Sequence, residues 1–324
     1  MKNSTINPTP PLLPGLVWRA ITDADLAALV ELAAACYLAD GGLGFMNEPD
    51  NLRDRFFPDA PGAAMGALAA EGNLVACASV HLICESDTER AIIVGQVRPE
   101  LRNKGIGTYL MHWSQEQALA LFTAPPVNKQ VLQVATESLT EAADRLYQAN
   151  GFESVFESLV MQRDLRLPLP DNTLPPGVTL TSWRPDLAEQ FFQAYQSAFR
   201  NRPGFPGWSA AEWIARVLDN DFKPEWSLLA RAGEMPLGFV IGNTDLTTDP
   251  PGGEVWQIGV IPAQRGHGLA SALLVETMRR MQAAGALSAQ LTVHINNPGA
   301  IQTYVQLGFA MAGRRARYER LVER

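Results

Sequence analysis

The sequence has few cysteines, and their positions exclude two classes of small structural site. The three residues, Cys36, Cys77 and Cys84, are odd in number and have no metal-ligand spacing, so neither a disulfide framework nor a metal site is predicted. Dispersed cysteines of this kind are typical of small buried residues in a reducing compartment. Residues 1–5 lead into a proline-rich stretch instead of an apolar signal core, and we therefore expect a cytoplasmic protein.

Long hydrophobic runs and an excess of positive charge are also missing. No window holds about 18 uninterrupted apolar residues, so no membrane partner is expected. The chain has 26 Lys and Arg against 34 Asp and Glu, a net charge of −8 at pH 7, which disfavours a nucleic-acid partner because such a partner requires a basic face. The length of 324 residues suits two domains, and nothing in the sequence indicates the oligomeric state.

What the sequence does contain is one pattern written twice. An apolar strand, a glycine-containing loop and a helix follow one another around residues 97–107 and again around residues 260–270, and each loop has the form Arg-x-x-Gly-x-Gly/Ala. Glycine allows backbone conformations that a side chain forbids, and the first turn of the next helix offers unpaired N–H groups at the positive end of its dipole. Each loop is therefore predicted to bind a pyrophosphate.

A second element recurs downstream of both loops. Residues 143–152 and 300–309 share the frame Ala-x-x-x-Tyr-x-x-x-Gly-Phe. The loops lie 163 positions apart (Arg102 to Arg265) and the tyrosines 157 positions apart (Tyr147 to Tyr304), and we place the difference in the proline-rich segment 123–128. The duplication predicts a flexible leader at 1–15, a first domain at 16–164, a linker at 165–177 and a second domain at 178–324.

On these residues both halves of the sequence resemble the GNAT superfamily, the Gcn5-related N-acetyltransferases. The resemblance implies an α/β (α+β) fold with two tandem domains, each a mixed, mostly antiparallel, twisted sheet flanked by helices. It also implies acetyl-CoA as cofactor and the amine of a small molecule as acceptor. The cofactor-binding residues that it implies are Val97, Arg102, Asn103, Lys104, Gly105, Ile106, Gly107, Val260, Arg265, Gly266, His267, Gly268, Leu269, Ala270 and Asn297.

The resemblance further implies catalytic residues. Tyr304 and Tyr147 correspond to the tyrosine that protonates the departing CoA thiolate, and Glu254 opens a strand where several family members carry a glutamate base. In the first half the matching position, six before Val97, is Ala91, and Glu89 is out of register. The first half also has Thr140 where the second has Asn297, the more usual residue of the family. The second half is therefore predicted to be the catalytic one.

Several alternatives stay open at this point. The tandem layout and residues 253–260 also resemble the mycothiol synthase group, whose acceptor is a cysteinyl amine on a sugar-inositol. Both halves could be active, or the chain could be a non-catalytic acyl-CoA sensor, in which the tyrosines only pack. His267 and His294 are weak catalytic candidates, and the aromatic residues Phe205, Trp208 and Trp213 fit either an acceptor pocket or a core.

Overall fold

The computed structural model describes residues 10–11, 13–85, 87–122, 129–171, 173–202, 205–218, 221–245 and 251–322. Residues 1–9 of the predicted leader lie outside these ranges. The segment 123–128, to which the sequence assigns the length difference between the two copies, lies outside them too. The chain forms two compact units: unit 1 holds the described residues up to Leu159 and from Ala312 onward, and unit 2 holds Val160–Met311.

The sheet of unit 1 has the strand order β1-β2-β3-β4-β5-β12. All of these neighbours are antiparallel except β4 and β5, which are parallel. The strands are β1 (Val17–Ala20), β2 (Gly62–Leu68), β3 (Leu74–Glu85), β4 (Thr88–Val97), β5 (Lys129–Thr136) and β12 (Ala310–Leu321).

Unit 2 repeats this arrangement with the order β11-β10-β9-β8-β7, in which only β10 and β11 are parallel. The strands are β7 (Thr179–Ser182), β8 (Leu228–Ala232), β9 (Met235–Asp245), β10 (Gly252–Val260) and β11 (Ser288–His294), and β6 (Glu153–Asp164) has residues in both units. The predicted mixed, mostly antiparallel sheet is confirmed in each unit.

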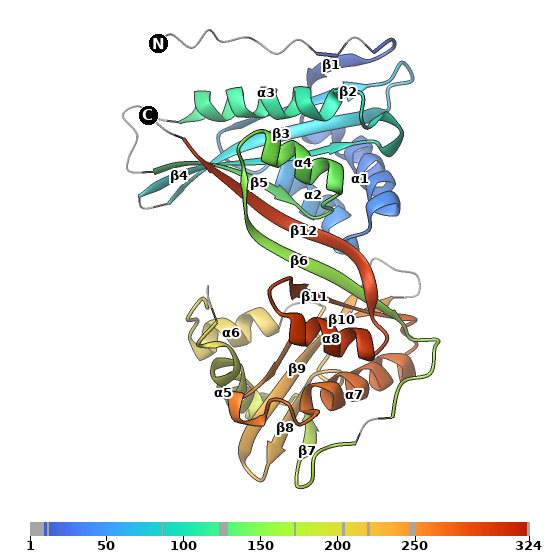
Figure 1. Cartoon of the computed structure of the whole chain (residues 1–324), viewed down its shortest axis with the longest axis vertical. Coiled ribbons are helices and arrows are strands. Elements are labelled where there is room, and N and C mark those ends of the chain that lie inside the picture. The colour runs from blue at the N-terminus through green and yellow to red at the C-terminus, as the bar shows by residue number, and fades with distance from the viewer. Residues whose placement is uncertain are drawn as a thin grey trace. The chain divides into compact units, whose positions relative to one another are not determined.

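The C-terminal strand β12 lies in unit 1 from Ala312 onward, although the sequence predicts one domain at 178–324. In Figure 1 this red strand runs beside β5, with which it pairs. Alternate residues of β12 point inward, and Ala316 and Tyr318 are 2% and 1% exposed in the unit 1 core. The Tyr318 hydroxyl donates a hydrogen bond to the Asp144 carboxylate at 2.7 Å. Because these side chains complete the core of unit 1, the compact units differ from the predicted domains in this segment.

A Thr or Ser followed three positions later by an acid predicts a capping box at Thr22–Asp25 and at Ser209–Glu212, and both boxes are present at helix starts. The Thr22 N–H donates to the Asp25 carboxylate at 3.0 Å just before α1, and the Ser209 N–H donates to the Glu212 carboxylate at 2.8 Å at the start of α6. These contacts satisfy N–H groups that a helix start leaves unpaired. The helices are α1 (Leu26–Asp40), α2 (Pro49–Phe56), α3 (Ile106–Leu121), α4 (Glu141–Ala149), α5 (Ala188–Phe199), α6 (Ala210–Val217), α7 (Leu269–Ala283) and α8 (Pro298–Gln306).

The helices of unit 1 cover both faces of its sheet. Successive residues of a strand point to opposite faces, and on β4 Ile93 packs with Leu110 of α3 whereas Val94 packs with Leu32 of α1. The α2 side chain Phe56 belongs to the same core as Val94. Helix α3 therefore lies on one face and α1 and α2 on the other. No helix in the described ranges combines the length and the apolar character needed to cross a bilayer.

Candidate active site

Both predicted phosphate loops enter a helix through a glycine in the left-handed region. Gly105 (φ +82°) is the N-cap of α3 and Gly268 (φ +78°) is the N-cap of α7. Two positions earlier, Asn103 (φ +60°) and Gly266 (φ +78°) are left-handed as well, a conformation that glycine and asparagine tolerate. The first N–H groups of each helix have no intrahelical acceptor, and with the helix dipole they form an anion site. The backbone of each loop therefore fits a pyrophosphate.

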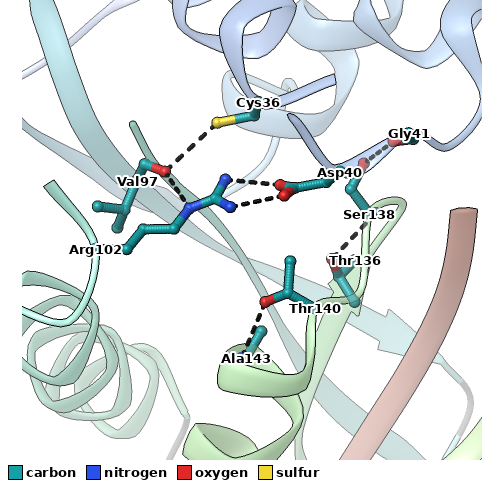
Figure 2. A network of polar contacts seen from close by, with 9 residues as sticks. All are labelled: Cys36, Asp40, Gly41, Val97, Arg102, Thr136, Ser138, Thr140 and Ala143. Atoms are coloured by element: carbon teal, nitrogen blue, oxygen red, sulfur yellow. Dashed lines mark hydrogen bonds and ion pairs between the residues drawn. The ribbon is translucent and has the colours of Figure 1, made fainter. Parts of the chain in front are cut away.

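The arginine of each loop is engaged by the protein itself. In Figure 2, Arg102 Nε donates to the Val97 carbonyl at 3.0 Å, and its two terminal nitrogens donate to Asp40 of α1 at 2.6 Å each. Arg265 repeats this contact with the Val260 carbonyl at 3.2 Å and donates to the Ala198 carbonyl of α5 at 2.9 Å. These side chains anchor the loops to the preceding strand and helix, so the phosphate ligands would be backbone N–H groups. Sequence reasoning missed this division of roles.

A splayed pair of parallel strands lies next to each loop. The pairing of β4 with β5 ends at Ile93 and Val134, and that of β10 with β11 ends at Val255 and Leu291, although all four strands continue. In unit 1 the opening is a cavity of about 240 Å³. Its walls include Gly105 and Thr108 of the phosphate loop and helix, the strand ends, and Tyr147. The cavity thus connects the anion site with the gap between the strands, as the pantetheine arm of CoA requires.

The two predicted general acids occupy matching helices. Tyr147 lies on α4 with its hydroxyl hydrogen-bonded to Thr136 and its ring 5.1 Å from that of Tyr318. Tyr304 lies on α8 and is 8% exposed. The residues that the sequence aligned before them, Thr140 and Asn297, are the N-caps of these helices and accept hydrogen bonds from Ala143 N–H at 3.1 Å and Ala300 N–H at 3.4 Å. Asn297 therefore has a structural contact in addition to its predicted cofactor contact.

Burial sets the protonation of these tyrosines. It raises the pKa of both Tyr147 and Tyr304 to about 12, because the ionised phenolate would lose its hydration. Each hydroxyl therefore holds its proton at neutral pH and can donate it to a thiolate.

We expect a spectroscopic titration to show this shift. The tyrosinate absorbance is measured against pH in the wild-type protein and in Tyr304→Phe. The difference between the two titrations will show no ionisation of Tyr304 below about pH 11. Since the folded-state pKa exceeds the unfolded value of about 10, the stability that this group contributes is present below pH 10 and is lost as the pH rises toward 12. Ionisation of Tyr304 near pH 10 in the folded protein would contradict the assignment.

Glu254 lies on β10 where this strand is still paired on both sides, with Asn243 of β9 and Gln290 of β11. The pairing of β10 with β9 shifts by one residue between Val255 and Gln257 of β10. Trp256 is therefore an extra residue in β10, a β-bulge. The extra residue of a bulge leaves the ladder, and bulges bend a strand and re-aim its groups. In unit 1, β4 pairs with β3 without a shift. Next to the splayed strands, unit 2 therefore has a bulge in β10, and unit 1 has none in the matching strand β4.

The bulge also corrects the comparison between the halves. Glu254 pairs with Gln290, and the counterpart of Gln290 in unit 1, Gln133, pairs with Ile92. The residue of unit 1 that matches Glu254 is therefore Ile92 instead of Ala91. The extra residue in β10 shifts the alignment of β10 with β4 by one position for residues before the bulge. Ile92 is 8% exposed and apolar, so this position in unit 1 has no carboxylate. Glu89, three residues away, pairs with Gln130.

The remaining candidates divide between core and surface. Trp213 is fully buried and stacks on Tyr195 at 5.0 Å. Its indole N–H donates to the Gln257 side-chain oxygen at 3.1 Å, a polar contact beside the bulge that the sequence did not reveal. His267 is exposed in its loop, and His294 Nδ1 accepts from the Asn296 N–H at 3.1 Å. Over the described ranges no cluster of His, Cys, Asp and Glu could hold a metal ion.

Comparison with known proteins agrees with the duplication. The Acetyltransferase (GNAT) family model matches residues 183–309, and an Acetyltransferase (GNAT) domain model matches residues 63–154. A mycothiol acetyltransferase of Parafrankia sp. is 29% identical, with 91% of this chain and 94% of the relative covered. A mycothiol acetyltransferase of Rhodococcus erythropolis is 31% identical over 66% of this chain and 70% of its own length.

A solved structure supports the same conclusion over the whole length. The crystal structure of a GCN5-related N-acetyltransferase from Sphaerobacter thermophilus has a TM-score of 0.70 and 26% identity, with 97% of this chain and 98% of that chain covered. The two matching family models, the Rhodococcus relative at 31% identity and the fold agree. The chain belongs to the GNAT acetyltransferase family, has two GNAT domains in tandem, and is an acetyl-CoA-dependent N-acetyltransferase.

Proposed function

We propose that unit 2 carries out the acetyl transfer and that unit 1 holds cofactor without performing the same reaction. The observation that carries this proposal is the bulge at Trp256 next to Glu254, because unit 1 has a regular β4 and the apolar Ile92 instead. A bulge takes backbone groups out of the strand ladder at the splay, where a polarised thioester carbonyl needs hydrogen-bond donors. A carboxylate at the same strand can accept the proton of the attacking amine.

In the proposed reaction the acceptor amine attacks the thioester carbon. Glu254 takes the amine proton, directly or through a water molecule, so that a neutral nitrogen forms the new C–N bond. The C–S bond then breaks, and Tyr304 donates its hydroxyl proton to the departing sulfur. The extra proton on the new amide nitrogen passes to the tyrosinate, directly or through water, and Glu254 releases its proton to solvent. Backbone N–H groups of residues 265–270 would hold the pyrophosphate, and those of residues 102–107 would do the same in unit 1.

We infer that the acceptor is the amine of a mycothiol precursor, the cysteinyl amine of a sugar-inositol. The relatives named mycothiol acetyltransferase support this, because the match to the Parafrankia relative covers 91% of this chain and 94% of that protein. The three cysteines, all free, favour the reducing cytoplasm as the location. A panel of amines with acetyl-CoA tests the acceptor, with turnover followed as loss of the thioester because the cysteinyl amine has a thiol of its own. The cysteinyl amine should have the highest kcat/KM, and a simpler amine that matches it would overturn this inference.

Replacing each of the two tyrosines by phenylalanine tests the assignment of the reaction to unit 2. We expect Tyr304→Phe to lower kcat about tenfold to a hundredfold with little change in the affinity for CoA, because only the proton for the leaving thiolate is removed. Tyr147→Phe is the matched control on α4 and should change kcat less than twofold. A larger loss for Tyr147→Phe than for Tyr304→Phe, measured by thiol release, would place the reaction in unit 1.

A further inference from the structure

The cavity of unit 1 is lined from both faces of the sheet. Gly105 and Thr108 border it at the phosphate loop, and Cys36, Asn47 and Arg55 border it from the side of α1 and α2. A thioester whose phosphates lie on the loop would pass between β4 and β5, so its acyl end would point toward the second group of residues. The chemistry of that end therefore determines which acyl group or small molecule fits.

Arg55 of α2 is the unusual side chain at this end. It is half-buried, and its guanidinium donates to the Met46 carbonyl at the long distance of 3.4 Å. Across the described ranges no carboxylate forms an ion pair with it. The nearby carboxylates are already taken, since Asp40 binds Arg102 at 2.6 Å and Glu137 binds Arg315 at 2.7 Å.

The charge of Arg55 is therefore poorly compensated. Loss of hydration on burial is the main influence on its guanidinium and lowers its pKa, with Glu137 acting in the opposite direction. Its guanidinium carbon lies 5.9 Å from the centroid of the neighbouring Phe56 ring, which offsets the charge less than a carboxylate would, and a cation partly removed from water without an ion-pair partner is costly to the folded state. Three further polar atoms of the cavity wall, Gln96 Oε1, Ser114 Oγ and Glu137 Oε2, are buried without a hydrogen-bond partner in the described structure, although Glu137 Oε2 lies 2.7 Å from Arg315 Nε in an ion pair. The wall of the cavity thus offers polar groups to a ligand.

We propose that the unit 1 cavity binds a carboxylate through Arg55. The planar guanidinium matches a carboxylate with two parallel hydrogen bonds, and such charge-assisted bonds are stronger than neutral ones. The carboxylate could be the distal group of a dicarboxylic acyl-CoA, or it could belong to a free small acid. Only the first source rests on the proposed binding of CoA by unit 1. The corresponding second helix of unit 2, α6, carries Arg216, whose charge lies 4.5 Å over the Trp208 ring.

Isothermal titration calorimetry tests the site in a Gly268→Val background, in which the cofactor loop of unit 2 is disabled. The titrants are acetyl-CoA, succinyl-CoA and succinate. We expect succinyl-CoA to bind about tenfold or more tightly than acetyl-CoA, and Arg55→Met to remove this difference. Arg53→Met is the matched control on the same helix, because Arg53 is paired with Asp23 and Asp50 on the surface, and it should keep the difference.

Thermal unfolding of the ligand-free variants provides a second readout. If Arg55 binds an anion in the cavity, the melting temperature of ligand-free Arg55→Met will be no lower than that of Arg53→Met, because the substitution removes a charge that has no ion-pair partner. Succinate binding that depends on Arg55, without a preference for succinyl-CoA, would assign the carboxylate to a free acid and leave the site intact. If no CoA ester binds while succinate does, the cofactor role of unit 1 fails but the carboxylate site stands. Equal affinity for both thioesters and no succinate binding would overturn the proposal, as would a preference that survives Arg55→Met.

Discussion

Replacing Gly268 with valine will lower kcat/KM for acetyl-CoA more than about 100-fold. Gly268 caps α7 with φ +78°, a conformation that strains a β-branched residue by about 1–3 kcal/mol. A Cβ atom at Gly268 would meet no heavy atom within 4 Å, so the effect comes from the backbone, which must move its N–H groups away from the phosphates. Thiol release measures the rate, and calorimetry measures the number of bound CoA molecules.

The matched variant in unit 1 is Gly105→Val. Gly105 has nearly the same φ, +82°, at the N-cap of α3, so the strain is comparable in the two variants. Both should lose one equivalent of CoA binding, but Gly105→Val should keep more than half of the wild-type turnover. Equal losses of turnover in the two variants would show that both units contribute to the reaction, and a larger loss for Gly105→Val would reverse the assignment.

Glu254→Gln will lower kcat about 100-fold to 1000-fold at neutral pH and leave CoA binding nearly unchanged. The amide keeps the size of the side chain but cannot accept the amine proton. The deficit should shrink as the pH rises past the pKa of the acceptor amine, because the nucleophile then arrives already neutral. A pH series of kcat for the variant and the wild-type protein measures both effects.

The control for this substitution is Glu234→Gln in the turn between β8 and β9. The Glu234 side chain is 88% exposed and pairs with Arg231 only at 3.8 Å, so its neutralisation should change kcat less than twofold. A Glu254→Gln variant with the turnover of this control would remove Glu254 from the mechanism. A deficit that stays constant with pH would indicate that the carboxylate positions the substrate instead of accepting a proton.

The features that the sequence predicted depend on local patterns. The loops at 97–107 and 260–270 and the capping boxes at Thr22 and Ser209 all depend on residues a few positions apart. Glycine at the N-cap and a polar residue three positions before an acid restrict the backbone directly. The repetition of these patterns then predicted two similar domains, which the two units and the two family models confirm.

The features that the sequence did not predict depend on contacts between distant residues. Strand β12 pairs with β5, more than 170 positions away, and its inward residues would fit the edge of many sheets. The bulge at Trp256 is visible only in the pairing of β10 with β9, and so the match of Glu254 to Ile92 was missed by one position. The contact of Arg102 with Asp40 likewise joins a loop to a helix 62 positions earlier.

The assignment of acetyl transfer to unit 2 is tested most directly by a crystal structure with CoA and the acceptor amine bound. The expected result is an acceptor nitrogen in unit 2, within about 3 Å of the Glu254 carboxylate or of one water molecule that it holds, and a CoA sulfur within hydrogen-bond reach of the Tyr304 hydroxyl. An acceptor bound instead in the unit 1 cavity, with the CoA sulfur next to Tyr147, would contradict it.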